Sequence, residues 1–158
     1  MVTAWRIVKS RYGSTAFDGE GARANGGRWN SAGVRVAYGS GSVALATLEV
    51  LIGLQRTGVL ASYVLTSAQF DEESVEVIAA ESLPDHWRRY PAPPETQTIG
   101  DRWVIEQRSL ALQVPSAIIP TESNYLLNPA HPDFASVAIS APVAFAFDER
   151  LAASPRKV

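Results

Sequence analysis

Prolines divide the second half of this sequence into short apolar segments, and this spacing places the strongest limit on the fold. Pro115, Pro120 and Pro142 separate segments of strand length, and a proline cannot donate a hydrogen bond inside a sheet. The strands predicted there are residues 111–114, 117–119, 136–140 and 143–147. Alternation and β-branched residues predict four more strands, at residues 3–8, 34–38, 60–66 and 74–80. Because most of these strands follow one another without an intervening helix, the sequence predicts an α+β fold with a mixed or largely antiparallel sheet.

Two helices are expected among these strands. Residues 42–55 form an apolar run that begins with Ser42, a residue type that commonly caps a helix N-terminus. Residues 98–110 begin with Thr98, and Asp101 three positions later completes a capping-box pattern. Both stretches are therefore predicted to be helices with their own start signals.

The other long segments lack periodicity and are predicted to be loops. Residues 10–27 contain five glycines, and residues 84–97 contain four prolines that oppose regular structure. The chain has 158 residues, of which 46% are hydrophobic, which is enough to bury one core and too little for two. We therefore expect a single domain over residues 1–158, with its core at about 3–148 and a tail at 149–158.

Charge and composition exclude several classes of function. A net charge of -2 gives no basic field for a phosphate backbone, so direct binding of nucleic acid is not expected. The chain has no cysteine, and His86 and His131 lie far apart, so no metal-ligand spacing is present. The first residues show no signal-peptide run, and no stretch reaches the roughly 20 apolar residues that span a bilayer. We expect a cytoplasmic protein without a metal or a membrane span.

Glu49 is the single charged residue between Ser42 and Leu54 in the predicted helix. At 100° per residue it shares one stripe with the small residues Ser42, Ala46 and Gly53, where a backbone or a ligand can come close. A buried carboxylate costs several kcal/mol unless it is paired or hydrogen-bonded. Two interpretations stay open: a functional carboxylate, or a structural salt bridge to an arginine such as Arg6 or Arg28.

Arg28 and Trp29 follow Gly26 and Gly27, which permit positive φ and close approach of a ligand. An arginine in such a place suits bidentate contact with a phosphate or a carboxylate. The alternative is a solvent-facing loop arginine beside a tryptophan that anchors the loop. Tyr38, which ends the segment "VRVAY", either lines a pocket or closes the edge of the sheet.

The segment 114–133 places Ser, Asn and Pro residues at the end of a predicted strand. Ser116 has no neighbouring histidine or acid in the sequence to activate it, so we interpret it as a hydrogen-bonding residue and not a nucleophile. His131 lies between Ala130 and Pro132, which favours a turn residue over a general base.

Six short motifs occur in one order and spacing that closely resembles the RES domain, a family of bacterial toxins paired with Xre-like antitoxins. They are "GGRWN", "VAYGS", "ALATLEVL", "TQTIGDRW", "VPSAIIP" and "NYLLNPAHPD". The resemblance runs from about Trp5 to Phe147 and is weakest over residues 71–95. Several separated motifs that agree at once are far more specific than any one of them.

The resemblance implies a fold similar to the ADP-ribosyltransferase domain of diphtheria toxin, with NAD as substrate. The arginine, glutamate and serine after which the family is named match Arg28, Glu49 and Ser116, which are therefore the expected catalytic set. The residues expected to bind NAD, as contacts or as walls of its pocket, are Arg28, Tyr38, Ser116, Asn124 and Asn128. The resemblance also implies an Xre-like helix-turn-helix antitoxin as partner.

This set of residues suits cleavage of the bond between nicotinamide and ribose. The nicotinamide of NAD is already a cation, so it can leave as a neutral base without a general acid. One carboxylate is then enough to stabilise the oxocarbenium-like ribose, whereas glycosidases use two. The ADP-ribose acceptor stays open between water, phosphate and a target protein. The alternative function is a non-catalytic protein-binding module in which Arg28 and Glu49 form a structural salt bridge.

Overall fold

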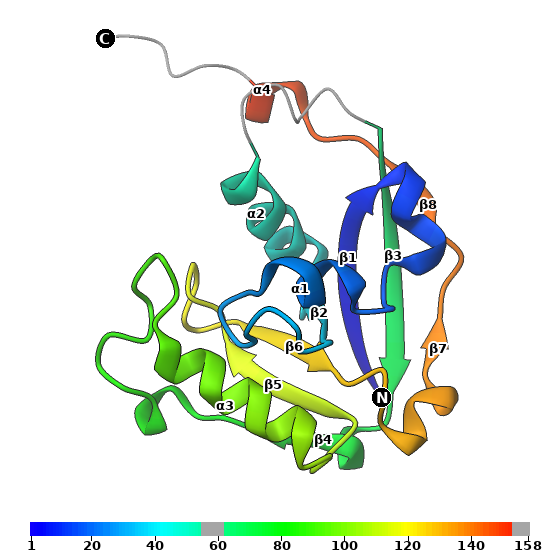
Figure 1. The fold of residues 1–158 in the computed structure, drawn as a ribbon. Coiled ribbons are helices and arrows are strands. Elements are labelled where there is room, and N and C mark those ends of the chain that lie inside the picture. The colour runs from blue at the N-terminus through cyan, green and yellow to red at the C-terminus, as the bar shows by residue number, and fades with distance from the viewer. Residues whose placement is uncertain (55–61, 153–158) are drawn as a thin grey trace, which may run out of the picture.

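The structure is a computed structural model that describes residues 1–54 and 62–152, and its central feature is one sheet (Figure 1). Within these residues the sheet has eight strands in the order β4-β5-β6-β2-β1-β3-β7, with β8 also paired to β3. β4 and β5 are parallel, and every other pair is antiparallel. The strands are β1 (Val2–Lys9), β2 (Ala37–Ser40), β3 (Tyr63–Phe70), β4 (Val75–Val77), β5 (Ala111–Pro115), β6 (Ser123–Leu127), β7 (Ala138–Ile139) and β8 (Val143–Phe145). The predicted α+β class with a mostly antiparallel sheet is confirmed.

The sheet consists of two parts that meet between β1 and β2. β1 pairs with β3 along its whole length, from Val2 opposite Phe70 to Lys9 opposite Tyr63. Its pairing with β2, in contrast, has one register pair, Trp5 opposite Ser40. In Figure 1, β1 and β3 stand steeply and point in opposite directions, whereas β5 and β6 lie across the picture. We call the short junction between β1 and β2 the seam.

The helices cover the sheet on either side of the seam. The α-helices are α1 (Glu20–Asn25), α2 (Val43–Gly53), α3 (Pro94–Ile105) and α4 (Glu149–Ala152), and the 3-10 helices are η1 (Ser10–Thr15), η3 (Glu72–Ser74), η4 (Ala80–Ser82) and η5 (Pro132–Ser136). α2 packs on the β1–β3 part through Ala46, in one cluster with Ile7 and Tyr63. α3 packs on the other part through the fully buried Trp103, beside Leu112. No helix in the described residues is long and apolar enough to cross a bilayer.

The first predicted helix is confirmed together with its cap. α2 begins at Val43, and the Ser42 hydroxyl accepts a hydrogen bond of 3.1 Å from the amide of Leu45. This bond satisfies one of the amides that a helix start leaves without a partner. The last predicted position, residue 55, lies outside the described residues.

The second helix exists, but the predicted start at residue 98 is wrong. α3 begins four residues earlier at Pro94, whose fixed φ and missing N–H suit the first turn of a helix. The Thr98 hydroxyl donates to the carbonyl of Pro94 at 2.9 Å inside the helix. Asp101 accepts hydrogen bonds from the amide and the hydroxyl of Ser31. The predicted capping box therefore does not form, and the proline loop ends before residue 94.

Each predicted strand except 117–119 overlaps a strand of the sheet, although residues 60 and 61 lie outside the described part of the chain. Residues 117–119 instead belong to the turn between β5 and β6. β6 itself lies in the segment 114–133, at residues where no strand was predicted. The predicted loop 10–27 contains η1 and α1, and the first four residues of the predicted tail form α4.

Candidate functional site

A small cavity of about 100 Å³ lies at the seam, between α2 and the strands that meet there. Trp5 and Arg6 of β1, Tyr38 of β2, Glu49 of α2 and Asn124 of β6 are among its lining residues. Three of the residues expected at a functional site, Tyr38, Glu49 and Asn124, therefore line one cavity, although 75 positions separate the last two.

The carboxylate of Glu49 is fixed through one of its oxygens. Oε1 accepts a hydrogen bond of 2.7 Å from Asn124 Nδ2 and one of 3.1 Å from the hydroxyl of Ser116. Oε2 has no hydrogen-bond partner within the described residues. No ion pair joins Glu49 to Arg6 or Arg28 anywhere in residues 1–54 and 62–152, so the salt-bridge interpretation is wrong. The carboxylate is held in place by neutral donors and keeps one oxygen for a ligand.

Ser116 lies behind Glu49 and is fully buried. Its hydroxyl donates to Glu49 and accepts from the amides of Ile118 at 3.1 Å and Ile119 at 3.2 Å. Its own amide donates to the carbonyl of Glu122 at 2.9 Å, which closes the turn after β5. These contacts orient the carboxylate of Glu49 and engage the buried hydroxyl of Ser116 with three hydrogen-bond partners.

The two asparagines carried over from the family motif lie in different environments. Asn124 lines the cavity, and its Oδ1 is buried without a hydrogen-bond partner in the described residues. Asn128 is fully buried, accepts from the amide of Ala130 at 3.0 Å and donates to the carbonyl of Val104 at 3.5 Å. Asn128 thus holds the turn after β6 and is not brought to the cavity. His131, as expected, lies in a turn and caps η5.

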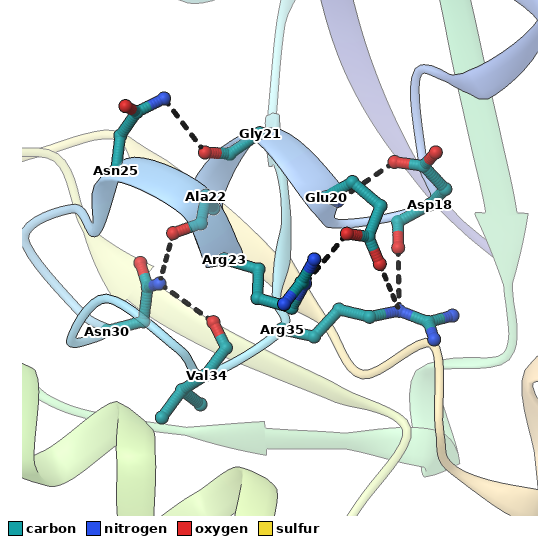
Figure 2. Close-up of polar contacts among 9 residues, drawn as sticks. All are labelled: Asp18, Glu20, Gly21, Ala22, Arg23, Asn25, Asn30, Val34 and Arg35. Carbon is teal, nitrogen blue, oxygen red and sulfur yellow. Dashed lines mark hydrogen bonds and ion pairs between the residues drawn. The ribbon is translucent and has the colours of Figure 1, made fainter.

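Tyr38 forms a fixed aromatic wall of the cavity. Its hydroxyl donates to Asn30 Oδ1 at 2.6 Å and accepts from the amide of Trp29 at 3.1 Å. Figure 2 shows how Asn30 is held in turn, with its Nδ2 donating to the carbonyls of Ala22 and Val34. Burial raises the pKa of the Tyr38 phenol well above its usual range, so the hydroxyl remains a donor.

The turn that carries Arg28 packs directly against this tyrosine. Gly26 adopts a φ of 71°, and a Cβ on Gly27 would lie 2.8 Å from the Tyr38 hydroxyl oxygen. The glycines were expected to leave room for a ligand. The space beside Gly27 is instead filled by Tyr38, so this glycine serves the packing of the turn.

Arg28 does not line the cavity but lies close to it. Its Nη1 donates to the carbonyls of Trp87 and Arg89, each at 2.8 Å, and so fastens the segment 84–93 to the turn. Burial lowers the pKa of the Arg28 guanidinium, and the negative charge of Glu49 acts in the opposite direction. Arg28 and Glu49 therefore share one electrostatic environment without direct contact.

Arg6 is a cavity residue that our candidate set did not include. Its Nη1 donates to the carbonyl of Tyr38 at 2.7 Å, and its Nε is buried without a partner in the described residues. Burial lowers the pKa of Arg6, while the carboxylate of Asp18 opposes this. The sequence contains a signal that could have identified Arg6. It is the one charged residue in the apolar segment 3–8, as Glu49 is in its helix.

Comparison with known proteins places this arrangement in a family. The family model described as the RES domain matches residues 3–148. A relative from Yersinia enterocolitica, named Toxin Res, is 40% identical over 148 residues, which are 93% of this chain and 97% of the relative. A relative from a Sphingobium species, named Prs ADP-ribosylating toxin, is 39% identical over 134 residues, which are 82% of this chain and 83% of the relative.

A solved structure shares the fold. It is the crystal structure of the M. tuberculosis MbcT–MbcA toxin–antitoxin complex, one chain of which matches with a TM-score of 0.75. The match covers 92% of this chain and 84% of that chain at 19% sequence identity, so it speaks for the fold alone. The family model and the Yersinia relative, by contrast, extend over nearly the whole sequence, and the Sphingobium relative extends over 82% of it. This chain therefore belongs to the RES domain family.

Proposed function

We propose that this chain is the toxin of a toxin–antitoxin pair and that it cleaves the bond between nicotinamide and ribose in NAD. The observation that carries the proposal is the carboxylate of Glu49, which Asn124 and Ser116 fix at a cavity with an aromatic wall. No cation forms an ion pair with this carboxylate within the described residues, so its charge is available to a substrate. Four relatives that carry the word toxin in their names support the proposal that this chain is a toxin.

The chemistry follows from one fixed negative charge. Nicotinamide leaves NAD as a neutral base, and the positive charge then moves to C1′ and the ring oxygen of the ribose. A carboxylate that is already oriented stabilises this charge without reorganising. In this role Glu49 Oε2 acts on the ribose, because Oε1 is occupied by its two hydrogen bonds.

The other cavity residues suit recognition of the same substrate. The fixed ring of Tyr38 offers a flat surface for nicotinamide, and Asn124 Oδ1 is a free acceptor for an amide N–H or a hydroxyl. Arg6 and Arg28 supply guanidinium donors for the phosphates of NAD. Ser116 acts through Glu49 and does not touch the substrate in this assignment.

The ADP-ribose acceptor is tested by product analysis. Water as acceptor gives ADP-ribose, and phosphate gives ADP-ribose 1″-phosphate only when phosphate is present. A protein acceptor gives a cellular protein whose mass rises by one ADP-ribosyl group. The name of the Sphingobium relative includes the words ADP-ribosylating, which supports including this third arm.

We expect Glu49→Gln to lower the rate of nicotinamide release by at least about 100-fold, because the neutral amide cannot stabilise the ribose cation. The substitution keeps an oxygen that accepts from Asn124 and Ser116, so the fold is expected to persist. Release of nicotinamide from NAD is measured by chromatography, and the fold by thermal unfolding. The matched control is Glu73→Gln, which removes an exposed carboxylate from η3. Undiminished release by Glu49→Gln rules the mechanism out.

We further propose an Xre-like antitoxin as the partner that restrains this activity. The fold match to a chain of a toxin–antitoxin complex supports such a partner. The non-catalytic alternative loses its structural basis, since its salt bridge between Arg28 and Glu49 is absent from the described residues. Co-expression with an Xre-like antitoxin tests the partnership: we expect a stable complex in which nicotinamide release is suppressed.

A further inference from the structure

The segment 84–93 is fastened beside the cavity by its main chain. Arg28 Nη1 holds the carbonyls of Trp87 and Arg89, which are the residues on either side of Arg88. Trp87 is buried, and the centre of its ring lies 6.3 Å from that of Trp29. The backbone of Arg88 is therefore fixed on both sides, and the direction in which its side chain leaves the segment is fixed with it.

The side chain of Arg88 extends toward the turn that positions Glu49. Its Nε donates to the carbonyl of Ala117 at 2.9 Å. Ala117 follows Ser116, whose hydroxyl donates to Glu49. The guanidinium of Arg88 is thereby anchored next to the buried side of the site, while the residue as a whole remains exposed to solvent.

Arg28 and Arg88 are two positive charges that belong to one part of the surface and that no direct ion pair engages within the described part of the chain. Neither arginine forms an ion pair in residues 1–54 and 62–152, and both are oriented by main-chain carbonyls. Burial lowers the pKa of Arg28, the charge of Glu49 opposes this effect, and the charge of Arg88 adds to it. An anion bound by both guanidinium groups would offset the repulsion between them.

We propose that Arg28 and Arg88 together bind a phosphoryl group beside Glu49. Arg28 keeps Nε and Nη2, and Arg88 keeps both Nη atoms, without partners in the described residues. Two planar guanidinium groups with free N–H donors match the oxygens of a phosphoryl group. The inference rests on the proposed function, and it adds Arg88, in the part of the sequence that resembles the family least, as a residue that determines substrate affinity.

The phosphoryl group has two sources, the diphosphate of NAD and inorganic phosphate as acceptor. If the pair holds the diphosphate, Arg88→Gln raises the KM for NAD by about tenfold with little change in kcat. Turnover of nicotinamide riboside, which carries no phosphate, is then unchanged. If the pair holds the acceptor, Arg88→Gln leaves the KM for NAD unchanged and raises the concentration of phosphate needed for half-maximal stimulation by a similar factor.

The matched control is Arg102→Gln, which removes the same charge from the exposed surface of α3. Equal KM and phosphate dependence in Arg88→Gln and Arg102→Gln overturn the inference. A second measurement separates it from the proposed function: calorimetric titration of the wild-type chain and of both variants with inorganic pyrophosphate. If Arg88→Gln weakens pyrophosphate binding about tenfold and Arg102→Gln does not, the result supports the anion site even when NAD is not cleaved. Pyrophosphate affinity that is equal in all three proteins contradicts the site whether or not NAD is cleaved.

Discussion

Ser116 has a hydroxyl that reaches three partners, the carboxylate of Glu49 and the amides of Ile118 and Ile119. The family resemblance allows Ser116 either to contact the substrate or to support Glu49. The burial of Ser116 favours the supporting role. A group that orients a carboxylate affects the rate of the chemical step, whereas a group that touches substrate also affects affinity.

Ser116→Ala is therefore expected to lower kcat for nicotinamide release and to leave the KM for NAD nearly unchanged. The substitution also removes the acceptor of two backbone amides, and this loss is expected to reduce the free energy of unfolding by about 1–3 kcal/mol. Steady-state kinetics and urea denaturation measure the two effects. A variant with normal kcat and a raised KM would instead place the Ser116 hydroxyl in contact with the substrate.

Individual residues of the site differed in how far the sequence could reveal them. A lone charge in an apolar segment singled out Glu49, and the same signal at Arg6 would have identified a second cavity residue. Asn124 and Asn128 lie four residues apart in one motif, yet one lines the cavity and the other is fully buried. Nothing local distinguishes them, because their environments come from the strands and helices that pack on β6.

At the scale of elements, α3 is positioned by an unusually close approach to the turn that carries Arg28. A Cβ on Gly100 would overlap the main-chain carbonyl of Trp29. The hydroxyl of Thr96 donates to the carbonyl of Arg28 at 2.7 Å, and Gln97 Nε2 donates to the carbonyl of Gly27 at 3.0 Å. The geometry of Arg28 therefore depends on how near α3 can lie.

Gly100→Ala is expected to displace α3 from Trp29 and to lower the free energy of unfolding by at least about 1–3 kcal/mol, since the obstructing atoms are backbone. The matched control is Gly21→Ala in α1, where a Cβ meets nothing within 4 Å. Helix propensity predicts that this control is neutral or stabilising by up to about 1 kcal/mol. Chemical denaturation of both variants decides the matter, and similar stability of the two would refute close packing at Gly100.

The elements that the sequence misplaced depend on partners far away in the chain. No strand was predicted at β6, because Ser, Asn and Pro surround it. The pairing of Tyr38 with Leu126 and of Gln113 with Tyr125 makes it a central strand. The start of α3 was placed too late because Thr98 and Asp101 look like a capping box. Asp101 is used by Ser31, 70 positions away, and a local pattern cannot show this.

For the whole molecule, the seam is the feature that the sequence predicted least. The predicted strands, most of which follow one another without a helix between them, were enough to predict the α+β class. They could not show that β1 pairs fully with β3 and at one register pair with β2, because strand order is set by the packing of complete elements. The candidate site lies where the pairing is shortest, so a ligand there contacts both parts of the sheet.

Binding of NAD is therefore expected to slow amide hydrogen exchange in β2 and in the adjoining residues of β1, but not in β4 at the sheet edge. The measurement uses the Glu49→Gln variant, so that NAD is not consumed. At an NAD concentration of about 100 times its Kd, amide exchange that requires ligand release is expected to slow about 100-fold. Exchange followed by mass spectrometry with and without NAD measures this. Uniform slowing across the sheet, or none, would place the ligand elsewhere.

The hydrogen bonds of Glu49 also give it a mechanical part in the structure. α2 packs on β1 and β3 through Ala46, while the donors to Glu49, Ser116 and Asn124, come from the opposite part of the sheet. The carboxylate is thus a clamp across the seam as well as a charge. A Glu49→Ala protein would lose both of these hydrogen bonds, and what it shows of partner or ligand binding would belong to a looser molecule. Glu49→Gln retains the acceptor and with it the clamp.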